Sequence, residues 1–371
     1  MKRVKRKDKR KNRKDILINT IIIILLFFLF LYCINIYFPH KEISKSNTEN
    51  IIIEGKTINF SSLTLEQKIA QMIMVRGDEK DLNFDKLNVG GIFLDEQDTE
   101  KQYSELIKEY QENSKIKLLV ATDMEGAWTP FHNTEPDQVF PAFSDIETYY
   151  EAEEIGFEEG ELLRKIGFNL NLAPVAEYSD EVYGGRTFSG SEEEIADKIA
   201  SYIKGLQKNV LGTCKHYPGK SMKKNLHYVS DEQEISKEDL YLFDVCIKNN
   251  ISSIMVSHQV VRGELDSKGK PSTVSEEVIS TIDNSVLIIA DEINMKGLSN
   301  FYRDKTEIYA DLINSGENII LDFKLNSYEL NKLIRELKKE VERGNIDEQN
   351  IDESVKKILT IKGYELIWNG I

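Results

Sequence analysis

The chain has few of the residues that mark specialised protein classes. Its 371 residues include 3 cysteines, 7 prolines and 21 glycines. Three cysteines are too few for a disulfide-rich scaffold, and so little proline and glycine excludes collagen-like and low-complexity chains. Hydrophobic residues make up 40% and charged residues 30%, which is typical of a globular protein with a large core.

Acidic residues outnumber basic ones outside the first fifteen residues. Residues 1–15 hold ten Lys or Arg and two Asp or Glu, a net charge of +8. Because the whole chain carries −15, the other 356 residues carry −23. A strongly acidic body repels phosphate backbones, so the sequence argues against nucleic acid as a partner.

Residues 16–38 form one uncharged, apolar run. At 1.5 Å per helical residue the run spans about 34 Å, enough to cross a bilayer core of about 30 Å. It is longer than the apolar core of a signal peptide, and no A-x-A-like cleavage site follows it. Cys33 follows Tyr32 rather than a small residue, which argues against a lipoprotein site. The sequence therefore predicts a transmembrane helix that contacts membrane lipid.

The basic residues ahead of this run set the expected topology, because positive flanks stay in the cytoplasm. We expect a single-pass protein of the cell membrane with a basic cytoplasmic tail (1–15), a transmembrane helix (16–38), a stalk (39–60) and an extracytoplasmic body (61–371). Cys214 and Cys246 could pair in such a location, but we expect two buried free thiols.

The body alternates short apolar runs with longer amphipathic stretches, which is the pattern of parallel βα units. Eight such strands, each followed by a helix, close a (β/α)₈ TIM-type barrel. Two more helical patterns, 328–343 and 352–362, end the chain. The apolar runs are residues 71–75, 90–94, 117–121, 170–175, 210–214, 253–257, 286–290 and 318–322.

Polar residues follow these runs, at the barrel end where active sites of this architecture lie. Charged and imidazole side chains gathered at one rim suit a polar substrate. The residues at the strand ends are Arg76, Asp95, Asp123, Glu177, Lys215, His216, His258, Asp291 and Asp322.

The sequence contains no Gly-rich phosphate loop, no serine nucleophile elbow and no HExxH or CxxC motif. The His, Asp and Glu residues are spread over separate strands, so we predict no metal and no cofactor. A strand-end Asp with a His on a nearby loop suits covalent glycosyl transfer, in which a carboxylate attacks an anomeric carbon.

Seven motifs in order resemble those of glycoside hydrolase family 3. The body is most similar to the N-terminal barrel of that family, and within it to the single-domain bacterial β-N-acetylglucosaminidases that act on peptidoglycan fragments. The motifs are LTLEQKIAQMIMV (63–75), DMEGA (123–127), NLNLAPV (169–175), RTF (186–188), KHYPG (215–219), MVSH (255–258) and ADEINM (290–295).

This resemblance implies a role for each matching residue. Asp291 is the nucleophile, and the next acid, Glu292, points away by strand alternation. His227 takes the acid/base position, with Asn225 in the place of the residue that orients it. The side chains expected to bind sugar hydroxyls are Asp123, Arg186, Lys215, His216 and His258.

The loop KHYPGKSMKKNLH departs from the family pattern. It is one residue shorter, and Asn225 replaces an Asp that would stabilise the imidazolium of the acid/base. An amide can orient a ring but supplies no charge; in a serine-protease triad a similar change lowers turnover about 10⁴-fold. Trp128 and Phe131 stand beyond the DMEGA motif, and we expect both to pack on the barrel rather than to stack on a sugar.

Three functions remain open from the sequence. The first is a retaining β-N-acetylhexosaminidase that removes terminal N-acetylglucosamine from cell-wall peptidoglycan fragments. The second is a weak or inactive barrel that binds wall glycan or a protein partner. The third is a β-glucosidase or phosphorolytic enzyme, because a fold alone does not determine the reaction.

Overall fold

The computed structural model describes residues 51–131 and 139–368. The predicted basic tail, the predicted transmembrane helix and residues 39–50 of the predicted stalk lie outside the described residues. Within the described ranges, no helix has both the length and the hydropathy needed to cross a membrane.

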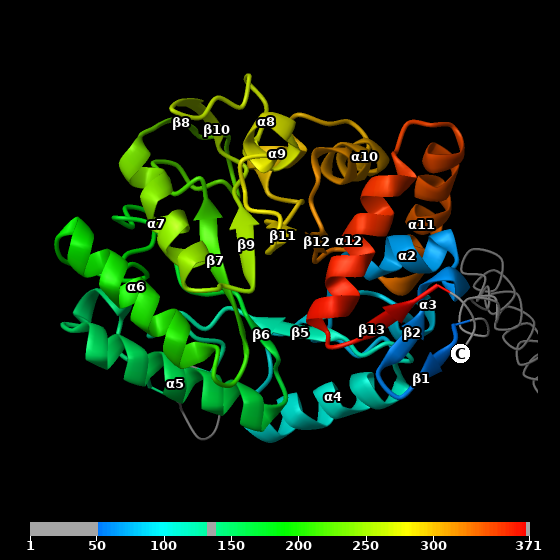
Figure 1. The fold of residues 1–371 in the computed structure, drawn as a ribbon, viewed down its shortest axis with the longest axis horizontal. Coiled ribbons are helices and arrows are strands. Elements are labelled where there is room, and N and C mark those ends of the chain that lie inside the picture. The colour runs from blue at the N-terminus through cyan, green and yellow to red at the C-terminus, as the bar shows by residue number, and fades with distance from the viewer. Residues whose placement is uncertain (1–50, 132–138, 369–371) are drawn as a thin grey trace, which may run out of the picture. The chain divides into compact units, whose positions relative to one another are not determined.

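Eight parallel strands form a closed barrel in the order β11-β12-β3-β4-β5-β6-β7-β9 (Figure 1). Each strand overlaps one of the eight predicted runs, so the predicted α/β barrel is confirmed. The strands are β3 (Ile73–Arg76), β4 (Gly91–Phe93), β5 (Leu119–Thr122), β6 (Leu170–Asn171), β7 (Leu211–Tyr217), β9 (Ser253–Val256), β11 (Leu287–Ala290) and β12 (Ile319–Asp322).

The barrel closes where β12 pairs with β3, with Ile320 opposite Ile73. Most strand residues are buried on both faces, because one face fills the barrel and the other meets the surrounding helices. The pairing of β7 with β9 is irregular between Cys214 and Tyr217. That irregularity lies at the two residues Lys215 and His216, which belong to the candidate site.

Helices surround the barrel, and α5 and α6 pack along each other (Figure 1). Polar caps define their starts: Ser191 and Ser236 each form a reciprocal capping box with the acid three residues later. The helices are α2 (Leu65–Gln71), α3 (Asn83–Leu87), α4 (Glu100–Asn113), α5 (Tyr149–Ile166), α6 (Glu192–Leu206), α7 (Lys237–Lys248), α8 (Glu276–Ile279), α9 (Lys296–Ser299), α10 (Lys305–Ser315), α11 (Ser327–Glu342) and α12 (Glu348–Ile361).

A small sheet joins the two ends of the described chain. Strand β2 (Thr57–Asn59) pairs with β1 (Ile53–Glu54) and with β13 (Glu365–Ile367). Ile58 and Phe60 are buried. Residues 51–60 were expected in the stalk and instead belong to the folded body, because their apolar side chains have a core to enter.

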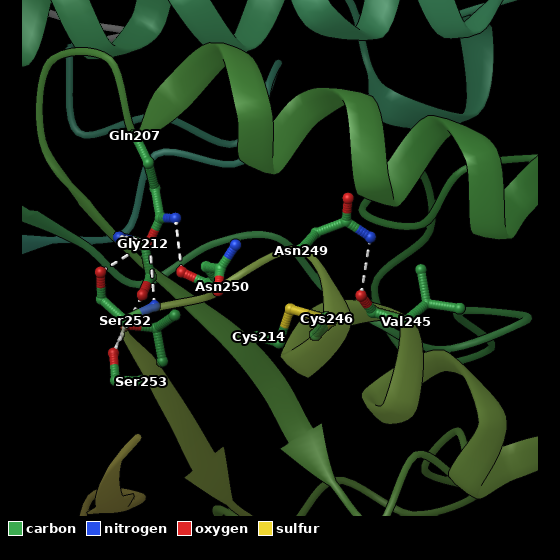
Figure 2. Close-up of a disulfide and its surroundings, with 10 residues drawn as sticks. Gln207, Gly212, Cys214, Val245, Cys246, Asn249, Asn250, Ser252 and Ser253 are labelled. Atoms are coloured by element: carbon green, nitrogen blue, oxygen red, sulfur yellow. Dashed lines mark hydrogen bonds between the residues drawn. A yellow bond between two sulfur atoms is a disulfide. The ribbon is translucent and has the colours of Figure 1, made fainter. Parts of the chain in front are cut away.

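Cys214 and Cys246 form a disulfide, so the expectation of two free thiols was wrong (Figure 2). The bond joins β7 to α7 across a separation of 32 residues. Sequence spacing could not reveal it, because the chain leaves β7, forms a long loop and then returns along the outside of the same strand. Close by, the Gln207 side chain holds the starts of β7 and β9 by bonds to Gly212 and Ser252 (Figure 2).

Candidate active site

A cavity of about 610 Å³ opens at the carboxyl ends of the barrel strands. This is the end at which TIM barrels carry their active sites, and the volume is typical of a small-molecule site. Six of the predicted site residues line it: Asp123, Arg186, Lys215, His216, His227 and Asp291. The other two, Asn225 and His258, do not.

One wall of the cavity holds four charged side chains, Asp123, Glu125, Arg186 and Lys215, here called the charged cluster. Arg186 grips both carboxylate oxygens of Glu125, and its Nη2 lies 3.1 Å from Oε1. Lys215 Nζ lies 2.5 Å from Asp123 Oδ1 and also contacts Glu125. The Glu125 and Lys215 side chains are 3% exposed, whereas that of Asp123 is 46% exposed. Glu125 is therefore the buried centre of the cluster, and Asp123 faces the cavity.

The members of the charged cluster keep one another ionised. Burial alone would raise the pKa of Glu125, but the adjacent Lys215 and Arg186 outweigh it and hold that pKa below its ordinary value. Burial would also lower the pKa of Lys215 and of Arg186, but the carboxylates raise both. Lysine and arginine have more N–H donors than these bonds use, so donors remain for sugar hydroxyls.

A tight turn after β5 positions Glu125. The backbones of Glu125 and Trp128 exchange two hydrogen bonds, of 2.7 and 3.2 Å. Gly126 has φ +64°, and a Cβ there would meet the Pro141 carbonyl oxygen at 2.3 Å. The amide of Gly126 also donates to buried Glu159 at 2.9 Å. The DMEGA motif therefore needs its glycine for both backbone conformation and space.

Glu177 orients the imidazole of His216. The Nδ1–H of His216 donates to Glu177 Oε1 at 2.8 Å, and the backbone amide of His216 lies 3.3 Å from the same oxygen. Both residues are buried. Because a carboxylate can only accept, this bond fixes the tautomer and leaves Nε2 for the cavity that His216 lines.

Asp291 follows β11 and lines the same cavity. Its Oδ1 accepts the backbone N–H of Glu292 at 2.7 Å. Burial alone would raise the pKa of Asp291, but His216, His258 and the Glu292 amide outweigh it and lower the pKa below the ordinary value. The carboxylate is ionised at neutral pH, as a nucleophile must be.

His258 lies behind the cavity rather than in its wall. Its side chain is buried, with Nδ1 2.9 Å from Thr273 Oγ1 and Nε2 3.0 Å from the carbonyl oxygen of Glu292. Burial lowers the pKa of His258 despite the nearby Asp291. Both ring nitrogens are occupied by protein groups, so the structure positions His258 to support the backbone next to Asp291 and not to contact a sugar.

His227 is carried by the loop of residues 218–231, here called the His227 loop, which connects β7 to β8 (Glu232–Ile235). The neighbouring Leu226 is 1% exposed, and its carbonyl accepts the Gly297 amide at 2.9 Å. A Cβ on Gly297 would meet Leu226 Cδ2 at 2.8 Å. A buried leucine thus anchors the loop, and it places the exposed His227 at the cavity.

Asn225 contacts the backbone of His227 and not its ring. The Asn225 Oδ1 accepts the His227 N–H at 2.9 Å, and the Asn225 side chain also lies beside the Tyr183 hydroxyl. Among residues 51–131 and 139–368, no carboxylate bonds the His227 imidazole. Asn225 shapes the loop, but it adds no charge to the acid/base position.

The remaining strand-end residues, Arg76, Asp95 and Asp322, have ion-pair or hydrogen-bond partners within the protein. Arg76 and Asp95 line the cavity and form an ion pair. Asp322 is fully buried, where it accepts from Lys305 at 2.8 Å and from the Tyr309 hydroxyl at 3.1 Å. Glu292 lines the cavity; the expectation that it points away was wrong, because the chain leaves β11 before it and strand alternation no longer applies.

Sequence reasoning gave no role to two residues that hold the site together: Glu177, which it placed at a strand end, and Glu125, which it did not single out. Glu125 was inside the recognised DMEGA motif, and charge balance at the site could have pointed to it. Lys215 and Arg186 are two buried cations, and one exposed carboxylate, Asp123, cannot neutralise both. Within the described ranges, no group of three or more His, Cys, Asp or Glu side chains is arranged to hold a metal ion.

Comparisons with known proteins found matches that cover most of the barrel. The model of the glycosyl hydrolase family 3 N-terminal domain matches residues 64–361. A β-hexosaminidase of Idiomarina loihiensis is 26% identical over 217 residues, which cover 53% of this chain and 64% of that protein. A β-hexosaminidase of Tolumonas auensis is 27% identical over 230 residues, which cover 56% of this chain and 68% of that protein.

Solved structures show the same barrel. A family 3 β-N-acetylglucosaminidase from a Paenibacillus species superposes with a TM-score of 0.72 at 26% identity, over 81% of this chain and 62% of that one. The chain thus spans less than two thirds of the Idiomarina and Paenibacillus proteins. LpqI of Mycobacterium tuberculosis has a TM-score of 0.73 at 20% identity, over 82% of this chain and 95% of that one. Since the family domain matches residues 64–361, the chain belongs to glycosyl hydrolase family 3.

Proposed function

We propose that this protein is a retaining β-N-acetylhexosaminidase that removes terminal N-acetylglucosamine from cell-wall peptidoglycan fragments. The observation that carries the proposal is the meeting of Asp291, His227 and the charged cluster in one cavity. Family membership supports glycoside hydrolysis, and two relatives are named β-hexosaminidase. An ionised carboxylate, an imidazole and several hydroxyl-binding donors are the groups that such a reaction needs.

In the first step the Asp291 carboxylate attacks the anomeric carbon and forms a covalent glycosyl ester. The bond from that carbon to the glycosidic oxygen breaks, and the imidazolium of His227 gives its proton to the leaving oxygen. Asp291 suits the attack because His216, His258 and the Glu292 amide hold its pKa below the ordinary value. His227 suits proton transfer because it is exposed at the mouth, where the leaving group departs.

In the second step the neutral His227 takes a proton from a water molecule, and that water attacks the anomeric carbon. The ester bond to Asp291 breaks, so the sugar leaves with its original β configuration. Throughout, Lys215, Arg186 and Asp123 hold the sugar hydroxyls. These contacts are held in place by buried Glu125, so little reorganisation accompanies bond breaking.

One observation favours a second candidate, a catalytically weak barrel that binds wall glycan. Asn225 contacts the backbone of His227, and no carboxylate of the described residues accompanies the ring. An acid/base without a charged partner stabilises its own cation less. The intact nucleophile favours catalysis, because a binding protein has no use for an ionised Asp291 beneath the sugar site.

We further propose that residues 16–38 anchor the protein in the cell membrane, with the barrel outside the cytoplasm. The Cys214–Cys246 disulfide supports this location, because structural disulfides persist in oxidising compartments and are rare in the cytosol. A reporter fused to the carboxyl terminus should be degraded when protease is added to intact cells. A protected fusion would overturn this topology.

The catalytic proposal is tested with the purified full-length chain and 4-nitrophenyl β-N-acetylglucosaminide. We expect turnover in which the β anomer is the first sugar product, and ¹H NMR of the reaction identifies that anomer. Asp291→Ala should lose about 10⁴-fold or more in kcat, and added azide, which can attack from the vacated side, should restore part of it. Matched reactions with a β-glucoside, and with phosphate added, test for β-glucosidase and phosphorolytic activity.

His227→Ala separates acid catalysis from binding. We expect it to lower kcat/KM about 10²-fold or more on a methyl glycoside, but less on the nitrophenyl glycoside, whose leaving group needs no proton. Equal losses on both substrates would remove His227 from the acid role. No turnover by wild type on any of these substrates, with wall-fragment binding retained, would favour the weak barrel.

A further inference from the structure

An aromatic wall of the cavity has no part in the chemistry described above. It consists of Trp128, from the turn after β5, and Tyr183, from the loop after β6. The two rings meet edge to face with centroids 5.8 Å apart, and both line the cavity. Trp128 is 46% exposed, although a large apolar ring at a barrel mouth normally packs away from water. The neighbouring Phe131 is fully buried, as expected, against Tyr103 and Phe168.

The exposed ring of Trp128 is held in one position. Its indole N–H donates to the Gly184 carbonyl at 3.0 Å, and its backbone is bonded to that of Glu125 on both sides of the turn. The Arg186 guanidinium lies 4.9 Å from the centroid of Tyr183 and so supports the second ring from the charged cluster. A fixed, exposed aromatic surface loses little side-chain entropy when a ligand covers it.

The wall adjoins the acid/base side of the cavity. The Asn225 side chain lies beside the Tyr183 hydroxyl, and Asn225 in turn holds the His227 amide at 2.9 Å. An acid that protonates the glycosidic oxygen must stand beside the bond to the leaving group. Tyr183, beside the acid/base loop, and Trp128, packed against Tyr183, therefore border the space into which the leaving group extends.

We propose that Trp128, backed by Tyr183, is the platform on which the leaving-group sugar of a disaccharide or longer glycan stacks. A pyranose ring presents a face of C–H groups, and such a face packs on an indole while the sugar hydroxyls remain in water. This inference rests on the proposed glycosidase function and names its substrate class: glycans whose second unit is a pyranose, rather than N-acetylglucosaminides of small alcohols.

Fluorescence tests the platform without any need for catalysis. The chain has 2 tryptophans, and the other, Trp368, lies 6.1 Å from Phe60 and does not line the cavity. In full-length Trp368→Phe combined with Asp291→Asn, which prevents hydrolysis, the tryptophan emission comes from Trp128 alone. We expect N,N′-diacetylchitobiose to change this emission saturably, and N-acetylglucosamine at saturation to change it much less.

The outcomes separate this inference from the function on which it rests. Calorimetry on the same variant measures binding independently. Chitobiose that binds without changing the Trp128 emission, or equal changes with both sugars, would overturn the platform alone. Failure of both sugars to bind would overturn the proposed function and the platform with it.

Kinetics provide a second test. We compare kcat/KM for chitobiose with kcat/KM for methyl β-N-acetylglucosaminide, whose leaving group has no ring. Trp128→Ala should lower the ratio of the two constants about tenfold, the loss expected for one stacked ring, and Trp128→Phe should restore most of it. Trp368→Phe, the matched control, should leave the ratio unchanged. If Trp128→Ala lowers both constants equally, the ring supports the Glu125 turn and not the leaving-group sugar.

Discussion

Two parts of the cavity, the charged cluster and the His227 loop, are built in opposite ways. The charged cluster is held by ion pairs among nearly buried side chains, centred on Glu125 at 3% exposure. The His227 loop presents exposed residues, among them Tyr228 at 75%, and is held at its tip by one buried apolar side chain, Leu226. The cluster is fixed by charge and the loop by packing.

This difference matches the two tasks that we propose for these two parts. A group that grips a sugar works best when its charges are already oriented, because reorganisation then adds nothing to the barrier. A group that gives a proton and later takes one must change charge, and deep burial would oppose its charged form. The contrast predicts that substitutions in the cluster affect stability and activity together, whereas substitutions in the loop affect mainly activity.

The largest effect should come from Glu125→Gln. This change leaves Lys215 and Arg186 as two nearly buried cations with one exposed carboxylate, and breaking a buried ion pair costs about 3–5 kcal/mol. We expect a matching loss in the free energy of unfolding, measured by urea denaturation, and a loss of activity. Asp123→Asn is the control: its carboxylate is half exposed, so it should lower kcat/KM with a small effect on stability. Equal destabilisation by both changes would contradict a buried centre at Glu125.

Removal of the disulfide should give the next largest effect. The bond closes a loop between residues separated by 32 positions, and closure of a loop of that size contributes about 3–4 kcal/mol. Cys214→Ala with Cys246→Ala should lower the thermal midpoint, as should dithiothreitol added to the wild type. Dithiothreitol should not change the double variant. A wild-type midpoint insensitive to reduction would show that the bond contributes no stability.

Glu159 should make stability depend on pH. Burial raises the pKa of this carboxyl to about 8, whereas in the unfolded chain it stays near the ordinary 4.5. The folded state therefore holds a proton that the unfolded state has lost, so stability falls as pH rises from about 4.5 to about 8. The slope approaches about 1.4 kcal/mol per pH unit. Glu159→Gln, which imitates the protonated form, should make the thermal midpoint less dependent on pH between pH 5 and 9. An unchanged pH dependence would show that Glu159 does not cause it.

The smallest effect should come from Asn225→Asp. The new carboxylate keeps the bond to the His227 amide and adds a charge near an exposed ring, where solvent screens it. A negative charge favours the imidazolium, so the alkaline limb of kcat/KM against pH should move up by less than about one unit. Stability should hardly change. Asn225→Ala, which lacks the acceptor, should lower activity at every pH, and a downward shift of the limb in Asn225→Asp would contradict the sign of this coupling.

The barrel and much of its rim could be predicted from the sequence because they follow local rules. Eight apolar runs gave eight strands, and the side chains directly after Ala290 and Cys214 reached the cavity, since backbone geometry alone carries a strand-end residue there. Four of the six predicted site residues that line the cavity lie at strand ends for this reason: Asp123, Lys215, His216 and Asp291. The other two, Arg186 and His227, are carried there by loops.

The parts that could not be predicted depend on contacts between distant elements. The position of His258 behind the cavity depends on Thr273, fifteen residues away. The importance of Glu125 arises only when Lys215 arrives from β7 and Arg186 from the loop after β6. The partner of Cys214 depends on where α7 packs, and the residue pattern does not predict how close Cys246 comes to Cys214.

The disulfide also changes what a single protease cut can do. The His227 loop, β8 and most of α7 lie between Cys214 and Cys246, inside one covalent ring. A cut at exposed Tyr228 or Val229 opens that ring but releases no fragment, because both new ends remain joined through the sulfur atoms. A protein working among extracellular proteases would stay one molecule after such a nick, and two bands would separate only on a reducing gel.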